Sequence, residues 1–255
     1  MLIILSPAKK LDFKTPVPYH GFSVNRFMEE AETIVNRLRK LSVSELSDIM
    51  HISTALANLN YERYRNWHRP FTIENAKAAI FAFNGDAYSG LDVASFDTDD
   101  LNYAQNHLRI LSALYGVIRP LDLIQPYRIE MGMKFGFDNY KSLYDFWRSK
   151  ITAAINEDLR LQGDNILINL ASEEYFKALD LNTLKAKVIT PVFKENKNGI
   201  LKIVSRNAKR ARGMMSRFIL KNKITNPEEL KFFDMEGYFY SDRPGNGEML
   251  VFVRH

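Results

Sequence analysis

The 255-residue sequence predicts a mixed α+β fold, a single domain in which an irregular mixed sheet is surrounded by helices. Three observations favour this class. Helical and strand-like segments follow one another irregularly, the chain ends in a predicted β-hairpin, and no linker rich in Pro, Gly or Ser divides it. The chain is 46% apolar and 25% charged, which is typical of a globular protein that buries a substantial core.

The first third of the chain is predicted to be largely helical, because no glycine lies between Gly21 and Gly85. Ser42 and Glu45 have the spacing of a capping box, in which each side chain satisfies a backbone N–H of the other residue. The expected elements are a buried strand over 2–5, an amphipathic helix over 24–41, a helix from Ser42 to Met50, a third helix capped by Ser53 and a fourth over 61–67.

The rest of the chain mixes short strands with helices. Asp97 and Asp100 are expected to begin a short helix, and Thr225 with Glu228 forms a second capping box. The turn of the C-terminal hairpin is placed at 244–247. The predicted strands are 79–83, 108–114, 165–170, 188–193, 201–204, 237–240 and 249–253, and the predicted helices are 142–161, 172–179 and 206–221.

All of the net positive charge lies in residues 196–227, which hold nine Lys or Arg and no Asp or Glu. The rest of the chain has 26 basic and 30 acidic residues. On a helix, Arg206, Arg210, Arg217 and Lys221 form one stripe without an acidic partner at i,i+4, and we expect them to face outward free of carboxylate partners. Gly213 on the same side is expected to admit a close neighbour. This pattern favours binding of a polyanion such as the DNA backbone, and the alternative is a solvated helix face.

Polar clusters follow three of the predicted strands, and a charged loop spans residues 109–132. Because ligands of open sheets gather beyond strand ends, we expect these clusters to share one rim and to form a pocket. The alternatives are surface turns, helix capping and an internal ion-pair network. The candidate pocket residues are Ser6, Lys9, Asp86, Tyr88, Asp122, Arg128, Glu130 and Ser172.

Metal, cofactor and membrane signals are weak. The chain has no cysteine, which excludes disulfides and thiolate ligands, and its five histidines show no i,i+3 or i,i+4 pair. We therefore predict no metal and no cofactor, although the spacing does not exclude an iron site whose ligands come from distant parts of the chain. No apolar stretch is long enough for a secretory signal or a membrane span, so we expect a cytoplasmic protein; the oligomeric state is not predicted.

Six groups of residues together resemble the peroxide stress protein YaaA family over nearly the whole chain. The matching groups are 2–12, Gly85-Asp86 with Tyr88 and Gly90-Leu91, 111–116 with 119–122, 125–128 with 130–132, 169–172 with 174–176, and Lys209 with 211–213. The resemblance implies a cytoplasmic bacterial protein that limits oxidative damage under peroxide stress and is linked to lower free iron. It also implies one domain of unusual topology, a positively charged cleft, and a helix-hairpin-helix element that binds duplex or branched DNA.

The helix-hairpin-helix element is placed within 42–67, with Asn58-Leu59-Asn60 as its turn because that region has no glycine. The leading hypothesis is DNA binding with little sequence preference. The runner-up is an enzyme that acts on a nucleotide or phosphorylated small molecule, with Asp86 or Glu130 as general base. A third is direct iron sequestration by dispersed His and carboxylate groups. The expected DNA contacts are Arg206, Lys209, Arg210, Arg212, Arg217 and Lys221, with Lys9 and Lys10 as further candidates.

Overall fold

Strand β1 (Leu2–Leu5) forms the centre of the main sheet and is fully buried. It pairs in parallel with β3 (Leu108–Ser112) on one side and with β6 (Ile166–Leu170) on the other. Strands that are covered on both faces read as continuous apolar runs, which is why the sequence Leu-Ile-Ile-Leu lies here. The computed structural model describes residues 1–19, 21–242 and 248–255.

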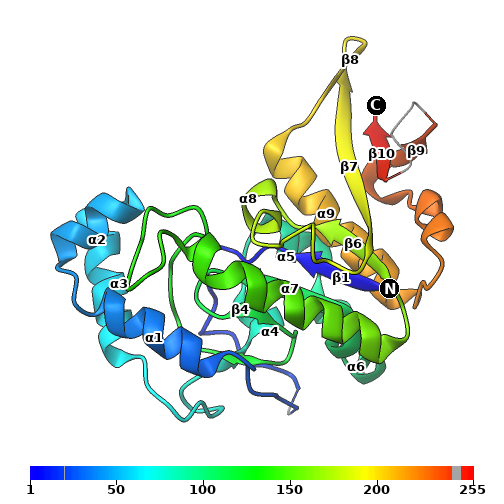
Figure 1. Ribbon diagram of the computed structural model, residues 1–255. Helices are drawn as coiled ribbons and strands as arrows, with labels where there is room; N and C mark the ends of the chain where they lie inside the picture. The colour runs from blue at the N-terminus through cyan, green and yellow to red at the C-terminus, as the bar shows by residue number, and fades with distance from the viewer. Residues whose placement is uncertain (20, 243–247) are drawn as a thin grey trace.

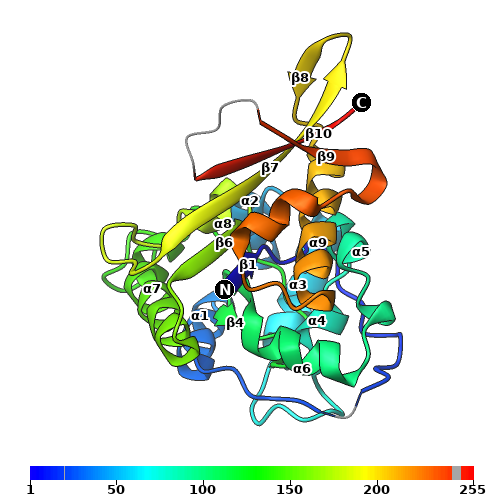
Figure 2. The same ribbon diagram turned by 90° about the vertical axis from the view of Figure 1, so that its right-hand side faces the viewer.

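The sheet extends outward in the order β4-β3-β1-β6-β7-β10-β9. β4 (Gly116–Ile118) is antiparallel to β3, whereas β7 (Lys187–Lys197) is parallel to β6 and β10 (Met249–Arg254) is parallel to β7. β9 (Tyr238–Ser241) pairs with β10 in antiparallel fashion, as predicted, while the expected turn at 244–247 lies outside the described residues. β8 (Ile200–Lys202) pairs with the far end of β7, and the two form an arm that projects from the body (Figures 1 and 2).

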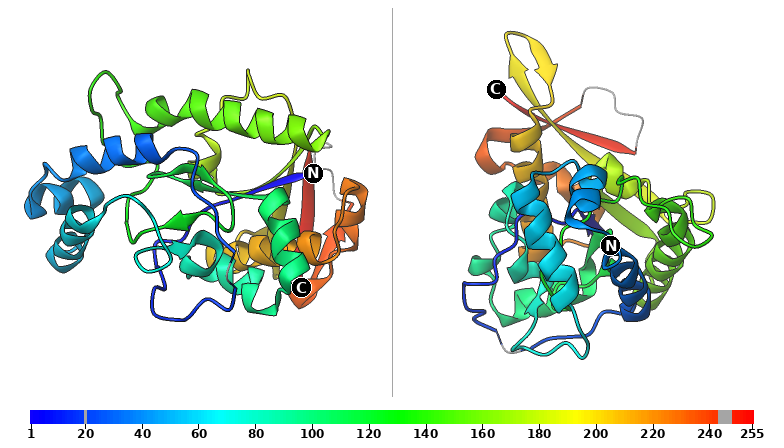
Figure 3. Two further views of the ribbon diagram at one scale, coloured as in Figure 1. Left: turned by 90° about the horizontal axis from the view of Figure 1, so that it is seen from below. Right: turned by 90° about the vertical axis from the view of Figure 1, so that its left-hand side faces the viewer.

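Helices cover both faces of the sheet. α7 (Leu143–Gln162) lies on one face, and α6 (Thr98–His107) and α9 (Ser205–Lys221) lie on the other (Figure 3). The predicted cap of α6 is confirmed, because Asp97 and Asp100 form a capping box. One continuous core joins residues from Met1 to Phe252, so a mixed α+β architecture is confirmed.

Three helices form a lobe beside the sheet: α1 (Met28–Leu38), α2 (Val43–Met50) and α3 (Thr54–Asn66) (Figure 1). The capping box of Ser42 and Glu45 is confirmed at the start of α2. The prediction of a separate helix over 61–67 is wrong, because α3 runs through this segment without a break. Asn58-Leu59-Asn60 therefore lies inside α3 and is not a turn.

Residues 79–83 were expected to form a strand, and this prediction is wrong. β2 (Lys77–Ala78) pairs with β5 (Leu123–Ile124) in a separate two-stranded ribbon, and α4 (Ala79–Ala82) follows at once. Backbone N–H groups at the start of α4 donate to carbonyls of the loop over 120–122 instead of to a sheet. A short buried apolar run has no periodicity that separates a strand from a helix, and its alanines favour the helix.

The remaining elements are short. The predicted capping box of Thr225 and Glu228 is wrong, because Asn226 caps the following 3-10 helix and accepts from the N–H of Glu228. These elements are α5 (Asp86–Leu91), η1 (Val93–Ser95), α8 (Glu173–Phe176), η2 (Pro227–Phe232) and η3 (Met235–Gly237).

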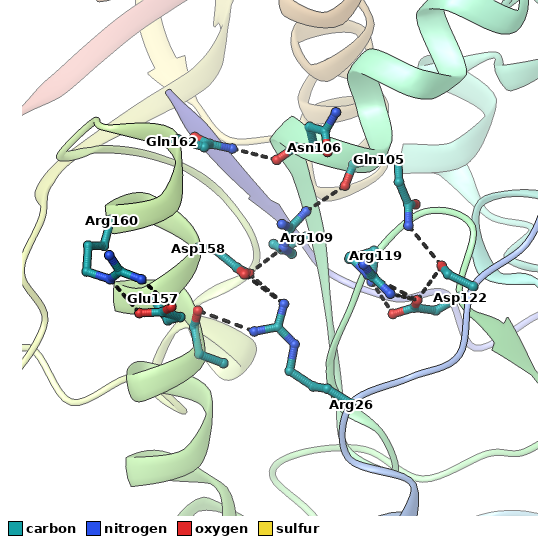
Figure 4. Close-up of polar contacts among 12 residues, drawn as sticks. Arg26, Gln105, Asn106, Arg109, Arg119, Asp122, Glu157, Asp158, Arg160 and Gln162 are labelled. Carbon is teal, nitrogen blue, oxygen red and sulfur yellow. Dashed lines mark hydrogen bonds and ion pairs between the residues drawn. The ribbon is translucent and has the colours of Figure 1, made fainter.

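A buried ion-pair network attaches α7 to the sheet (Figure 4). Asp158 of α7 accepts hydrogen bonds from Arg109 of β3 at 2.6 Å and from Arg26 at 2.7 Å. Arg109 also donates to the carbonyl of Gln105 at 3.0 Å. A buried carboxylate with two guanidinium partners has its lone pairs satisfied, so the network fixes the helix against the sheet edge.

Candidate functional site

A cleft with a volume of about 340 Å³ opens at the carboxyl ends of β1 and β6. Residues 5–10 form its floor, residues 84–88 with α9 form one wall, and residues 127–130 with the start of α8 form the other. The sequence places polar residues at these strand ends, and the topology brings them to the same edge of the sheet.

Ser6 ties the floor of the cleft to both walls. Its hydroxyl accepts from the backbone N–H of Ser172 at 2.8 Å and lies 3.2 Å from the Ser172 hydroxyl. Its carbonyl accepts from the hydroxyl of Tyr88 at 3.1 Å. The end of β1 is therefore held by α8 on one side and by α5 on the other.

The structure brings most of the predicted pocket residues together. Those that line the cleft are Ser6, Lys9, Asp86, Tyr88, Arg128, Glu130 and Ser172, together with Lys10. Asp122 does not line it. Its side chain accepts from the Ser23 hydroxyl at 2.6 Å and from Arg119, and the residue is only 2% exposed (Figure 4). Asp122 therefore belongs to an internal ion-pair network, which was the alternative interpretation of its loop.

The expectation that the basic stripe of α9 is free of acidic partners is wrong. Each of its four cations contacts a carboxylate from a distant segment. The pairs are Arg206 with Asp86 at 3.5 Å, Arg210 with Glu236 at 2.6 Å, Arg217 with Asp92 at 3.0 Å and Lys221 with Asp100 at 2.6 Å. An i,i+4 search does not find such partners, because they lie on neighbouring elements and not on the helix itself.

The neighbour admitted by Gly213 is helix α5. A Cβ atom on Gly213 would lie 1.7 Å from the carbonyl oxygen of Ala87, and one on Gly90 would lie 2.1 Å from that of Arg210. The two glycines allow the backbones of α5 and α9 to approach closely. The stripe therefore packs along α5 and the segment after it, where three of the four acids lie.

Two cations of α9, Lys209 and Arg212, lie in the cleft instead of the stripe. Among the described residues, neither side chain has an ion-pair or hydrogen-bond partner. Burial lowers the pKa of Arg212, because the surroundings solvate the guanidinium less well than water does. Arg212 is half-buried and Lys209 is exposed, and the lack of a counter-charge at both makes this wall of the cleft attractive to an anion.

The opposite wall carries carboxylates and aromatic rings. Glu130 lies 2.7 Å from the ammonium of Lys9 and 3.6 Å from the guanidinium of Arg128. Glu174 was not among the predicted pocket residues, although it follows the strand-end cluster at β6. Tyr127 and Tyr175 also line the cleft, and burial raises the pKa of both phenols, so they stay protonated.

A second hollow of about 260 Å³ adjoins the cleft at Glu130 and Glu174 and reaches the turn between α2 and α3. His51 lies at this turn with φ of 50°, a left-handed conformation that ends α2, and Ser53 caps α3. The reversal that was predicted at Asn58-Leu59-Asn60 is therefore made by residues 51–53. The helical lobe faces the cleft through this turn.

Metal and membrane features can be assessed for the described part of the chain. Within residues 1–19, 21–242 and 248–255, no three His, Asp or Glu side chains are grouped so that they could hold a metal ion. None of the helices found there combines the length and the apolar character that a membrane crossing requires.

Comparison with known proteins finds relatives that match this chain over nearly its whole length. A family model described as peroxide stress protein YaaA matches residues 1–243. Similar proteins include a UPF0246 protein of Saccharophagus degradans, 50% identical over 254 residues, and one of Psychromonas ingrahamii, 48% identical over 254 residues; each alignment covers 100% of this chain and 99% of the relative. A UPF0246 protein of Alteromonas mediterranea is 49% identical over 255 residues, with 98% of the relative covered. The chain therefore belongs to the peroxide stress protein YaaA family, and its role lies in the peroxide stress response.

Proposed function

We propose that this peroxide stress protein acts through its central cleft, which binds the phosphate group of a ligand of about nucleotide size. One observation carries the proposal: Lys209 and Arg212 face the cleft without carboxylate partners, whereas the four cations of the stripe on the same helix are all paired. Lys10, which is exposed at the rim, adds a third cation.

An anion in the cleft would compensate the solvation free energy that the unpaired guanidinium of Arg212 loses. A guanidinium that is partly removed from water and unpaired loses solvation without an electrostatic gain. A phosphate oxygen offers charge-assisted hydrogen bonds to Arg212, and arginine can donate two such bonds at once. The volume of about 340 Å³ lies at the lower end of the range of small-molecule sites, which suits a mononucleotide.

Ligand-induced thermal stabilisation tests this proposal. AMP, GMP, CMP and UMP are titrated against the wild type, Arg212→Ala and Arg217→Ala. We expect saturable stabilisation by at least one nucleotide and a loss of affinity of about 10- to 100-fold in Arg212→Ala, because a hydrogen bond to a charged group contributes about 1.5–3 kcal/mol. Arg217→Ala removes an arginine of the same helix that is paired with Asp92, so its affinity should match the wild type. If none of the four nucleotides binds the wild type, the proposal is wrong.

DNA binding is the second candidate function, and the exposed cations at the cleft rim and on the β7–β8 arm favour it. Lys10 and Lys209 are exposed at the rim, and Lys197 and Lys202 are exposed on the arm. The pairing of the stripe changes what this hypothesis predicts. Of the eight cations that the sequence assigns to DNA, Lys9 and the four stripe residues already have acidic partners.

The salt dependence of duplex affinity shows whether DNA contacts only the cations of the cleft or all eight cations that the sequence assigns to it. With about three cleft cations on phosphates, the log–log slope is about −2.7, whereas all eight assigned cations would give about −7. Lys197→Gln together with Lys202→Gln should reduce the slope by about 2 if the arm also contacts phosphates. Duplex affinity that does not change between 50 and 200 mM salt would remove DNA from consideration.

Iron enters the proposal only indirectly. Because the described residues contain no grouped His, Asp or Glu ligands, we assign the effect on iron that the resemblance implies to the ligand of the cleft. Equilibrium dialysis against Fe(II) checks this assignment. Stoichiometric Fe(II) binding by the wild type would contradict it.

A further inference from the structure

The two walls of the cleft carry opposite charge, and they form the two ends between which a ligand would lie. Lys209 and Arg212 give one wall unpaired positive charge, whereas Glu130 and Glu174 lie on the other wall and continue into the second hollow. Glu130 has both carboxylate oxygens occupied, because Oε2 contacts Lys9 and Oε1 contacts Arg128. Of these two glutamates, Glu174 is the one whose carboxylate remains available to a ligand, and Asp86 on the cationic wall lies 3.5 Å from Arg206.

The position of Glu174 is fixed by two hydrogen bonds. Its Oε1 accepts from the backbone N–H of Gly132 at 3.0 Å, and its carbonyl accepts from the hydroxyl of Tyr144 at 2.9 Å. Its Oε2 has no hydrogen-bond partner among the described residues. An ionised carboxylate oxygen can only accept, so this atom presents a fixed acceptor to the cleft.

The surface between the two ends is suited to a flat ring. Leu5, Pro7, Leu170 and the rings of Tyr88 and Tyr127 line it. The two phenol hydroxyls are already used within the protein, by the carbonyl of Ser6 at 3.1 Å and by the hydroxyl of Ser112 at 2.7 Å. Tyr88 and Tyr127 are only 7% and 5% exposed, and their rings pack against Phe83 and Tyr115, so they add a narrow apolar lining beside which a planar base can lie.

Resting on the phosphate-binding function proposed above, we infer that Glu174 is a specificity residue that selects a nucleotide whose base carries an N–H donor. The phosphate lies at the Lys209 and Arg212 end, the base lies beside the tyrosines, and its N–H group donates to Glu174 Oε2. Glu174 is half-exposed, so a ligand without such a donor would cover its carboxylate oxygen and displace water without offering a hydrogen bond in return, which weakens binding.

Three nucleotides with one phosphate and different bases test this inference. GMP and AMP carry N–H donors on the base, whereas purine riboside 5′-monophosphate carries none. We expect the wild type to bind GMP or AMP about tenfold more tightly than purine riboside 5′-monophosphate, measured by calorimetry at equal salt and pH.

The Glu174→Gln variant sharpens the test. Its amide oxygen can keep the contact with the N–H of Gly132, which turns the amide nitrogen, a donor, toward the ligand. The preference for GMP or AMP should then fall to within about threefold, while phosphate-dependent binding persists. Glu173→Gln is the matched control, because the neighbouring side chain is 83% exposed and paired with Lys177 outside the cleft.

The outcomes separate this inference from the function on which it rests. Equal affinities for the three nucleotides in the wild type would overturn the role of Glu174 and leave phosphate binding intact. A preference that survives unchanged in Glu174→Gln would also overturn it. If none of the three nucleotides binds, the proposed function fails, and the inference fails with it.

Discussion

Replacing Gly213 with alanine tests the packing that aligns the basic stripe with its acids. The added Cβ would lie 1.7 Å from the carbonyl oxygen of Ala87 and 2.8 Å from the backbone nitrogen of Leu91. Both atoms belong to the α5 backbone, so no side-chain rotation relieves the clash. The two helices must move apart, and the wall of the cleft that they share moves with them.

Two opposing effects decide the sign of the change in stability. Alanine in a helix interior is favoured over glycine by about 1 kcal/mol. Overpacking of a close contact costs about 1–3 kcal/mol, and a clash with rigid backbone lies at the upper end of that range. The net loss is therefore about 2 kcal/mol, which corresponds to a decrease in Tm of about 4–8 °C for a chain of this size.

Thermal and urea unfolding followed by circular dichroism measures this loss. Gly163→Ala is the control, because Gly163 has a φ of 68° but no heavy atom within 4 Å of the added Cβ. It should lose only about 1 kcal/mol, from the left-handed backbone alone. A Gly213→Ala protein that is as stable as the wild type would show that α5 and α9 are not in close backbone contact.

Three further changes probe the ion pairs and one titrating group. Asp158→Asn should cost about 3–5 kcal/mol in urea unfolding, because two guanidinium groups lose their buried counter-charge; Glu157→Gln, on the exposed side of the same helix, should leave stability unchanged, and a change of the same size in both variants would contradict the network. A double-mutant cycle of Asp92→Asn and Arg217→Ala should give a coupling free energy of about 0.5 kcal/mol that vanishes in 1 M salt. A coupling free energy that persists in 1 M salt would mean that the two side chains do not interact as a solvent-exposed ion pair. Burial lowers the pKa of His107, so the unfolded chain binds a proton more readily than the folded chain, and stability falls as the pH drops below about 6.5. In His107→Gln, the urea midpoint should therefore change less between pH 7 and pH 5 than in the wild type. The same change of the midpoint with pH in both proteins would exclude His107 as its source.

Local signals in the sequence predict the local structure of this protein well. The capping boxes at Ser42 and Asp97 mark the starts of α2 and α6, because the two residues of such a cap lie three positions apart. The same spacing at Thr225 and Glu228 fails, because the neighbouring Asn226 caps the helix instead. The run over 79–83 is a different case. Its hydrogen bonds go to a loop some forty residues away, and no local pattern shows whether the partner is a strand or a loop.

In the candidate site too, features that depend on nearby residues are predicted, whereas ion pairs between distant elements are not. The clusters at Ser6 and Ser172 are predicted to meet, because the parallel strands β1 and β6 bring their carboxyl ends to one edge. Asp86 also lines the cleft, but it follows helix α4 and not the strand that was expected there. The acidic partners of the stripe are not predicted, since each lies on another element. For the same reason the sequence does not separate Lys209 and Arg212, which face the cleft, from the paired cations beside them.

The central position of β1 has a consequence for how the protein is made. Both of its partner strands lie more than a hundred residues further along the chain, so β1 leaves the ribosome long before either of its neighbours. Until β3 has emerged, the Leu-Ile-Ile-Leu segment stays an unpaired, aggregation-prone strand, and its second edge stays open until β6 has emerged. The contacts between α2 and α3 are local, so this part of the helical lobe can form during the delay.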